Sequence, residues 1–129
     1  MTVLWIGLGA ALAVPYLRLG DRRTGRWARV WWSGGLIVAG LAYVALAVAE
    51  GATGAALAVE LAGVAAFGAM AALGLRGHLG WTAAGWLLHA GWDAAVQTAL
   101  GVGPAWYVWL CVGFDAVVGV ALYLRAVRR

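Results

Sequence analysis

The sequence predicts an all-α fold: a polytopic membrane bundle of five transmembrane helices, with its N-terminus outside and its C-terminus in the cytoplasm. Of the 129 residues, 65% are hydrophobic and 11% are charged. A soluble domain typically has about 45–50% apolar and about 25% charged residues. A soluble fold of this length could not bury so much apolar surface, whereas a fold embedded in lipid has no need to bury it.

Long apolar runs give the number of helices. A helix that crosses the membrane needs about 20 mostly apolar residues. Gly and Pro, which end helices and favour tight reversals, occur in the segments between the runs. Five runs qualify, and together they form one transmembrane domain over residues 1–129: 2–19, 30–49, 53–75, 81–100 and 105–124.

The basic residues predict the orientation. Five alternating spans put every basic residue on one side, and the positive-inside rule places that side in the cytoplasm. Because these residues lie only between and after apolar runs, we expect a lipid bilayer as partner and no nucleic acid. The Ala-, Gly- and Arg-rich composition without Lys suggests a bacterial cytoplasmic (inner) membrane. All nine are arginines: Arg18, Arg22, Arg23, Arg26, Arg29, Arg76, Arg125, Arg128 and Arg129.

Ionisable residues inside the apolar runs are the main functional signal, because each costs roughly 2.5–3.5 kcal/mol on insertion scales. His89, Asp93 and Gln97 follow the spacing i, i+4, i+8 and share one face of a helix. An antiparallel hairpin between the last two spans places His89 level with Asp115. The sequence therefore predicts a ligand- or proton-binding layer roughly 10–15 Å below the outer surface, with these candidates: Glu60, His89, Asp93, Asp115, Gln97, Tyr43, Trp86 and Trp92.

Electrostatics favour a function for this layer. Three carboxylates cannot all stay charged in a dry interior, and His89 balances only one of them. Either some are protonated or a cation lies among them. One imidazole with three carboxylates could hold iron or manganese, but the spacing matches no recognised metal motif and contains no Glu-x-x-His pair. The metal and any cofactor therefore stay unidentified.

Each candidate also has a purely structural interpretation. His89 could serve only as a hydrogen-bonding partner of Asp115 or Asp93, and the two aspartates could simply join helices. Glu60 could face a helix of another chain, in a homodimer or beside a partner subunit. Trp86 and Trp92 could be packing residues.

The last two predicted helices carry a recurring polar and aromatic pattern. It resembles small, uncharacterised bacterial multispan integral membrane proteins, and the resemblance implies a membrane fold without implying an activity. The pattern is His89-x-x-Trp92-Asp93, followed by Pro104-x-Trp106-Tyr107 and Cys111-x-x-Phe114-Asp115.

Three functions follow from these observations. The first is binding or movement of a small solute, a cation or protons. The second is a membrane-embedded enzyme acting on a lipid or isoprenoid, with Asp93 or Asp115 as general acid and His89 setting its protonation. The third is an accessory subunit whose polar stripe pairs with a partner's helices. A stripe that faces lipid would favour the third.

Overall fold

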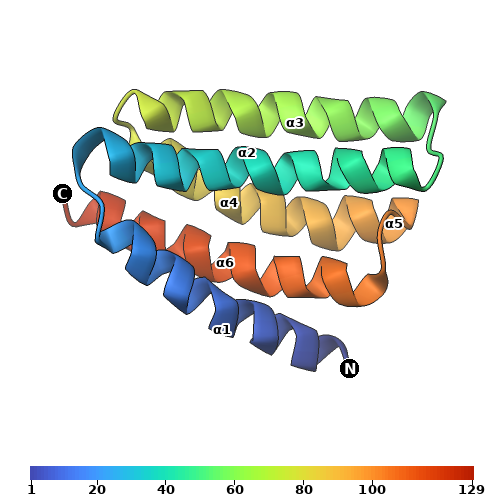
Figure 1. The fold of residues 1–129 in the computed structure, drawn as a ribbon, viewed down its shortest axis with the longest axis horizontal. Helices are drawn as coiled ribbons and strands as arrows, with labels where there is room; N and C mark the ends of the chain where they lie inside the picture. The colour runs from blue at the N-terminus through green and yellow to red at the C-terminus, as the bar shows by residue number, and fades with distance from the viewer.

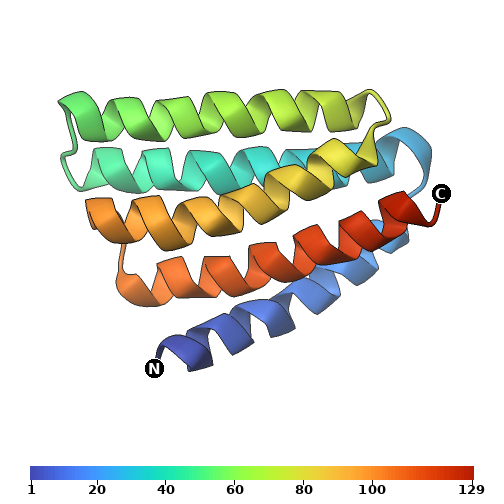
Figure 2. The same cartoon turned by 180° about the vertical axis from the view of Figure 1, so that it is seen from behind.

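The computed structural model describes all of residues 1–129 and contains helices joined by short turns (Figure 1). Helix α6 packs between α1 and α4, and α3 packs against both α2 and α4. The rear view shows the same arrangement (Figure 2). The all-helical prediction is confirmed, and the elements in chain order are α1 (Thr2–Asp21), α2 (Gly25–Ala49), α3 (Gly54–Leu75), α4 (Leu79–Trp92), the π-helical turn η1 (Asp93–Gln97), α5 (Thr98–Leu100) and α6 (Ala105–Val127).

Four helices, not five, are long and apolar enough to cross a membrane by themselves: α1, α2, α3 and α6. The expected fourth span, residues 81–100, differs because a π-helical turn interrupts it. Its residues are divided among α4, η1 and α5, and none of these pieces alone has the required length. Four apolar helices of this kind indicate a multi-pass membrane protein.

Helices α2 and α6 extend by three or more residues beyond the apolar runs that predicted them. Helix α2 begins at Gly25 instead of residue 30, and α6 ends at Val127 instead of residue 124. Hydropathy marks only the apolar part of a helix, whereas backbone hydrogen bonding continues through arginine, which is a good helix former. The extra turns therefore carry arginines beyond the apolar segment.

The distribution of side chains is that of a protein surrounded by apolar solvent. Large apolar residues in the middle of helices point outward, among them Val38 on α2, Leu61 on α3, Leu88 on α4 and Val120 on α6. Polar side chains are buried instead: Ser33, Glu60, Thr82, His89, Asp93, Gln97 and Asp115. Exposed apolar side chains in such number mark membrane or protein contact, and a lipid bilayer would cover them.

Glycines set the closest contacts between helices. A Cβ added at Gly113 would lie 2.0 Å from the carbonyl oxygen of Ile6, so the backbones of α1 and α6 touch there. A Cβ at Gly119 would lie 2.9 Å from the backbone nitrogen of Leu87. Small residues let membrane helices approach closely, and the contact at Gly119 holds α6 against the helix that carries His89.

Candidate functional site

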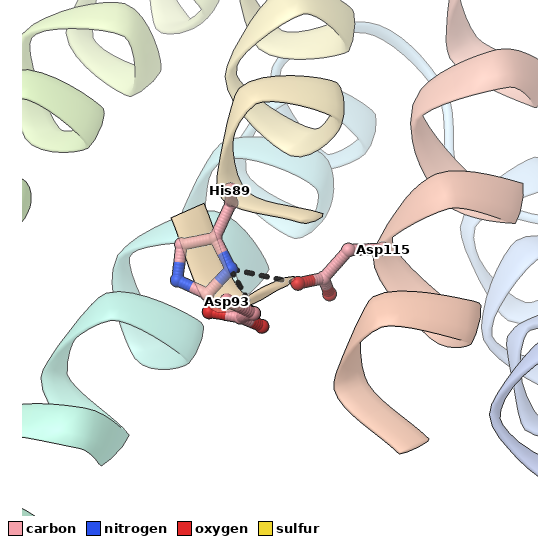
Figure 3. Close-up of side chains that lie close together, drawn as sticks. All are labelled: His89, Asp93 and Asp115. Atoms are coloured by element: carbon pink, nitrogen blue, oxygen red, sulfur yellow. Dashed lines mark hydrogen bonds and ion pairs between the residues drawn. The ribbon is translucent and has the colours of Figure 1, made fainter. Parts of the chain in front are cut away.

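Three ionisable side chains meet between α4 and α6. His89 lies near the end of α4, Asp93 is the first residue of η1, and Asp115 lies in the middle of α6. Nδ1 of His89 is 2.7 Å from Oδ2 of Asp115 and 3.5 Å from Oδ2 of Asp93 (Figure 3). With Asp115 ionised, the Nδ1–H group of His89 donates a hydrogen bond to it. We call these three residues the HDD cluster.

The HDD cluster is closed off from the outside of the bundle. The exposed fractions are 1% for His89, 0% for Asp93 and 2% for Asp115. Neither carboxylate oxygen of Asp93 has a hydrogen-bond partner. A buried carboxylate without partners is costly in its charged form, so Asp93 is the group in the cluster that most needs a proton or another cation.

The π-helical turn explains how one helix presents three polar residues in line. In a regular α-helix, residues i and i+8 point about 80° apart. A π turn is wider and contains one extra residue. The extra residue removes most of the angle between the side-chain directions of His89 and Gln97. Their side chains, like that of Asp93, are buried in the bundle. The sequence spacing predicted the shared face, but it contained no signal for the π turn.

Glu60 and Gln97 form a separate buried pair. Nε2 of Gln97 donates a hydrogen bond of 2.9 Å to Oε2 of Glu60. The other oxygens of both side chains, Oε1 of Glu60 and Oε1 of Gln97, have no partner. The structure thus brings Glu60 to Gln97 rather than into direct contact with the HDD cluster, and both residues face the interior of their own bundle.

A small hollow connects the two groups of polar residues. It contains about 160 Å³ of empty space, with no part wide enough for a water molecule. Tyr43 contributes to its wall, and its buried hydroxyl group has no hydrogen-bond partner. The other lining residues include Glu60, His89, Gln97, Phe67 and Trp92.

The two predicted tryptophans have different positions. Trp92 lines the hollow, and its ring lies 5.8 Å from that of Phe67 in an edge-on arrangement. Trp86 lies in the main apolar core, where its Nε1–H group donates a hydrogen bond of 3.1 Å to the carbonyl oxygen of Trp32. Trp86 is therefore a packing residue in this structure.

Phe67 is a wall residue of the hollow that the sequence did not single out. Its ring meets the His89 ring edge-on at 4.8 Å, so it helps to hold the imidazole in place. The sequence could have pointed to Phe67 as a site residue, because it is the sole aromatic residue of α3 and follows Glu60 by seven positions. That spacing puts both residues on the same helix face.

The HDD cluster has the chemistry of a cation site. One ligand atom from each of its three residues lies within 4.8 Å of the others, close enough for a single metal ion to contact all three. The same atoms can share protons, because an imidazole and two carboxylates are all able to take up or release one. The cluster can therefore bind a metal ion or exchange protons.

Fold and site together define a class: a multi-pass membrane protein with a buried histidine–aspartate cluster. Comparisons with protein-family models, with curated proteins and with solved structures find no match to this chain.

Proposed function

We propose that this protein binds and exchanges protons inside the membrane, at the HDD cluster. The observation that carries the proposal is the state of Asp93, which is fully buried and whose two carboxylate oxygens accept no hydrogen bond. The nearest basic group is the imidazole of His89, at 3.5 Å, and Asp115 already engages that imidazole. A second positive charge is needed to neutralise the site, and a proton on Asp93 supplies it.

The neighbouring Glu60–Gln97 pair brings another carboxylate into the same dry interior. The amide of Gln97 donates to Glu60 but carries no charge. A charged carboxylate in a dry interior is strongly disfavoured unless a cation balances it. Glu60 is therefore a second buried carboxylate without a balancing cation, and Tyr43, whose buried hydroxyl group has no hydrogen-bond partner, lines the same hollow as Glu60 and His89.

The size of the hollow favours protons over a larger solute. Its 160 Å³ of empty space has no part wide enough for a water molecule. A proton needs no cavity, because it resides on the side chains themselves. The accessory-subunit hypothesis was to be favoured by a polar stripe that faces lipid. His89, Asp93 and Gln97 are instead buried in their own bundle, which favours a site within this chain.

The proposal includes a fifth crossing of the membrane. Segments α4, η1 and α5 contain 14, 5 and 3 residues. At about 1.5 Å per residue they extend about 33 Å, enough to cross a hydrocarbon core about 30 Å thick. With the arginine-rich end in the cytoplasm of a bacterium, the N-terminus lies outside and the HDD cluster lies in the outer half of the bilayer.

A second candidate function is binding of a divalent metal ion at the same cluster. The observation in its favour is that the three ligand atoms all lie within 4.8 Å of one another. A neutral imidazole, two carboxylates and a divalent cation also give zero net charge. An imidazole with two carboxylates suits several divalent metals of the first transition series.

Infrared difference spectroscopy tests the proton proposal and separates it from the metal candidate. The full chain in lipid is titrated with acid and base, and the C=O stretch of protonated carboxylic acids is followed. We expect Asp93→Asn to remove one component of this signal, whereas the control Glu50→Gln, which changes an exposed residue, leaves the buried components in place. The proposal is wrong if Asp93→Asn leaves the spectrum unchanged.

Proteoliposomes test whether the bound protons move. With a pH-sensitive dye inside, we expect the wild-type protein to dissipate an imposed pH gradient, and Asp93→Asn to stop this dissipation without preventing insertion. An asparagine fits the site but cannot exchange the proton. Metal analysis of the same preparation decides the second candidate: one equivalent of metal, lost in Asp93→Asn, would replace the proton proposal by the metal proposal.

A further inference from the structure

A cavity of about 270 Å³ opens at the end of the bundle where α1 leads into α2 and α3 leads into α4. Three arginines from separate parts of the chain line it: Arg23 in the first turn region, Arg29 on α2, and Arg129 after α6. Its wall contains no Asp or Glu side chain. The cavity is therefore a concave site of strongly positive charge, far along the bundle from the HDD cluster.

Two of these arginines are held in position by the protein. Nε of Arg29 donates a hydrogen bond of 3.0 Å to the carbonyl oxygen of Leu75. The guanidinium carbon of Arg23 lies 3.9 Å from the centre of the Trp31 ring, a cation–π contact. The terminal N–H groups of Arg29 remain free to donate to a ligand. A pre-positioned guanidinium group can bind phosphate through two parallel hydrogen bonds.

The starts of two helices also face the cavity. Its lining includes Thr24 and Gly25, where α2 begins, and Gly77 and Leu79, where α4 begins. Neither start has a side-chain cap. The first N–H groups of a helix have no partner within the helix and carry a partial positive charge, so both starts add donors that suit an anion.

The charge of this end is not neutralised by its own side chains. All nine arginines lie here, with Asp21 as the one acidic residue. Asp21 is already engaged by Arg125, through contacts of 3.1 and 2.7 Å. The helix ends that gather here are visible together in both ribbon views (Figures 1 and 2).

We propose that this cavity binds a phosphate group, either in the headgroup of an anionic phospholipid or as free phosphate. Charge, hydrogen-bond donors and concave shape all match a phosphate, and basic pockets between membrane helices suit anionic headgroups. This site does not depend on the proposed proton binding.

Native mass spectrometry of the full chain tests the proposal with two lipids, dioleoylphosphatidylglycerol and dioleoylphosphatidylcholine. The cavity variant is Arg23→Gln with Arg29→Gln. The control is Arg22→Gln with Arg26→Gln, which removes the same charge from exposed arginines of the same region outside the cavity. We expect phosphatidylglycerol to bind about tenfold more weakly to the cavity variant, and less than about threefold more weakly to the control, because exposed charges are screened.

Inorganic phosphate distinguishes the two sources. If phosphate raises the melting temperature of the wild-type protein but not of the cavity variant, and phosphatidylglycerol binds no better than phosphatidylcholine, the ligand is free phosphate. The proposal would be overturned if the cavity variant and the control lost phosphatidylglycerol affinity equally. It would also be overturned if the wild-type protein bound neither phosphatidylglycerol nor phosphate. If the double variant does not fold, Arg29→Gln alone, with Arg26→Gln as its control, repeats the comparison with one charge removed from each.

Discussion

The protein contains two contacts between a carboxylate and a basic side chain that have the same length but different surroundings. Oδ2 of Asp115 lies 2.7 Å from Nδ1 of His89, and Oδ2 of Asp21 lies 2.7 Å from a terminal nitrogen of Arg125. The first pair is buried, whereas the side chains of the second are 50% and 32% exposed for Asp21 and Arg125. Because the two distances are equal, we expect burial to decide how much each contact contributes to the free energy of unfolding.

The difference arises from what water can do at each place. Water and salt screen the Asp21–Arg125 pair, so each partner is well solvated without the other. In the HDD cluster each polar atom depends on its neighbours, and Asp93 has unpartnered oxygens even with those neighbours in place. Removing a partner from the buried contact leaves a charge in a dry interior. Four substitutions test this comparison.

His89→Leu is expected to have the largest effect. It removes the basic group that Asp115 and Asp93 share, and breaking a buried pair typically costs about 3–5 kcal/mol. Unfolding in mixed micelles, followed by circular dichroism, measures the loss. The matched control is His78→Leu, at an exposed histidine in the turn before α4. Equal losses at the two histidines would contradict the comparison, and His89→Leu combined with Asp115→Asn should recover part of the stability.

Gly119→Ala changes the spacing of the buried pair without removing a charge. The added Cβ would lie 2.7 Å from Cγ of Leu87 and 2.9 Å from its backbone nitrogen. Overpacking of this kind costs about 1–3 kcal/mol, and it pushes α6 away from the helix that carries His89. In the control Gly91→Ala, the new Cβ meets no atom within 4 Å. If both alanines change the midpoint of unfolding equally, close approach at Gly119 is unimportant.

Gln97→Leu tests the neighbouring buried pair. It leaves Oε2 of Glu60 without its donor, and an unsatisfied buried polar group costs about 1–3 kcal/mol. Replacing both residues by leucine should cost less than replacing Gln97 alone, because no polar atom is then left without a partner. A double-mutant cycle on the free energy of unfolding measures this coupling, and strict additivity would show that the pair does not interact.

Asp21→Asn is expected to have the smallest effect. Surface ion pairs contribute about 0.2–1 kcal/mol, and the half-exposed carboxylate places this pair at the low end of that range. The difference from wild type should shrink further at high salt, where exposed charges are screened. Thermal unfolding at two salt concentrations checks both points. A loss as large as that of His89→Leu would mean that burial does not control the strength of these contacts.

The candidate site was partly predictable because its residues follow helical spacing. His89, Asp93 and Gln97 share a face by their positions in the sequence, and the hairpin between the last two spans placed His89 beside Asp115, as the structure has it. Glu60 was expected in the same layer, and it pairs with Gln97 and lines the same hollow as His89. Trp86 was expected at the site and instead packs in the apolar core. These two outcomes depend on helix rotation, which hydropathy does not determine.

The sequence alone determined the helical content, the apolar runs and the polar stripe, because each follows from neighbours a few positions apart. Only the tertiary structure decided that a π turn divides the fourth run, that glycine contacts bring α4 and α6 together, and that three arginines enclose one cavity. The physical reason is that such features depend on how helices rotate and approach one another. That arrangement is a property of packed surfaces, to which residues far apart in the chain contribute.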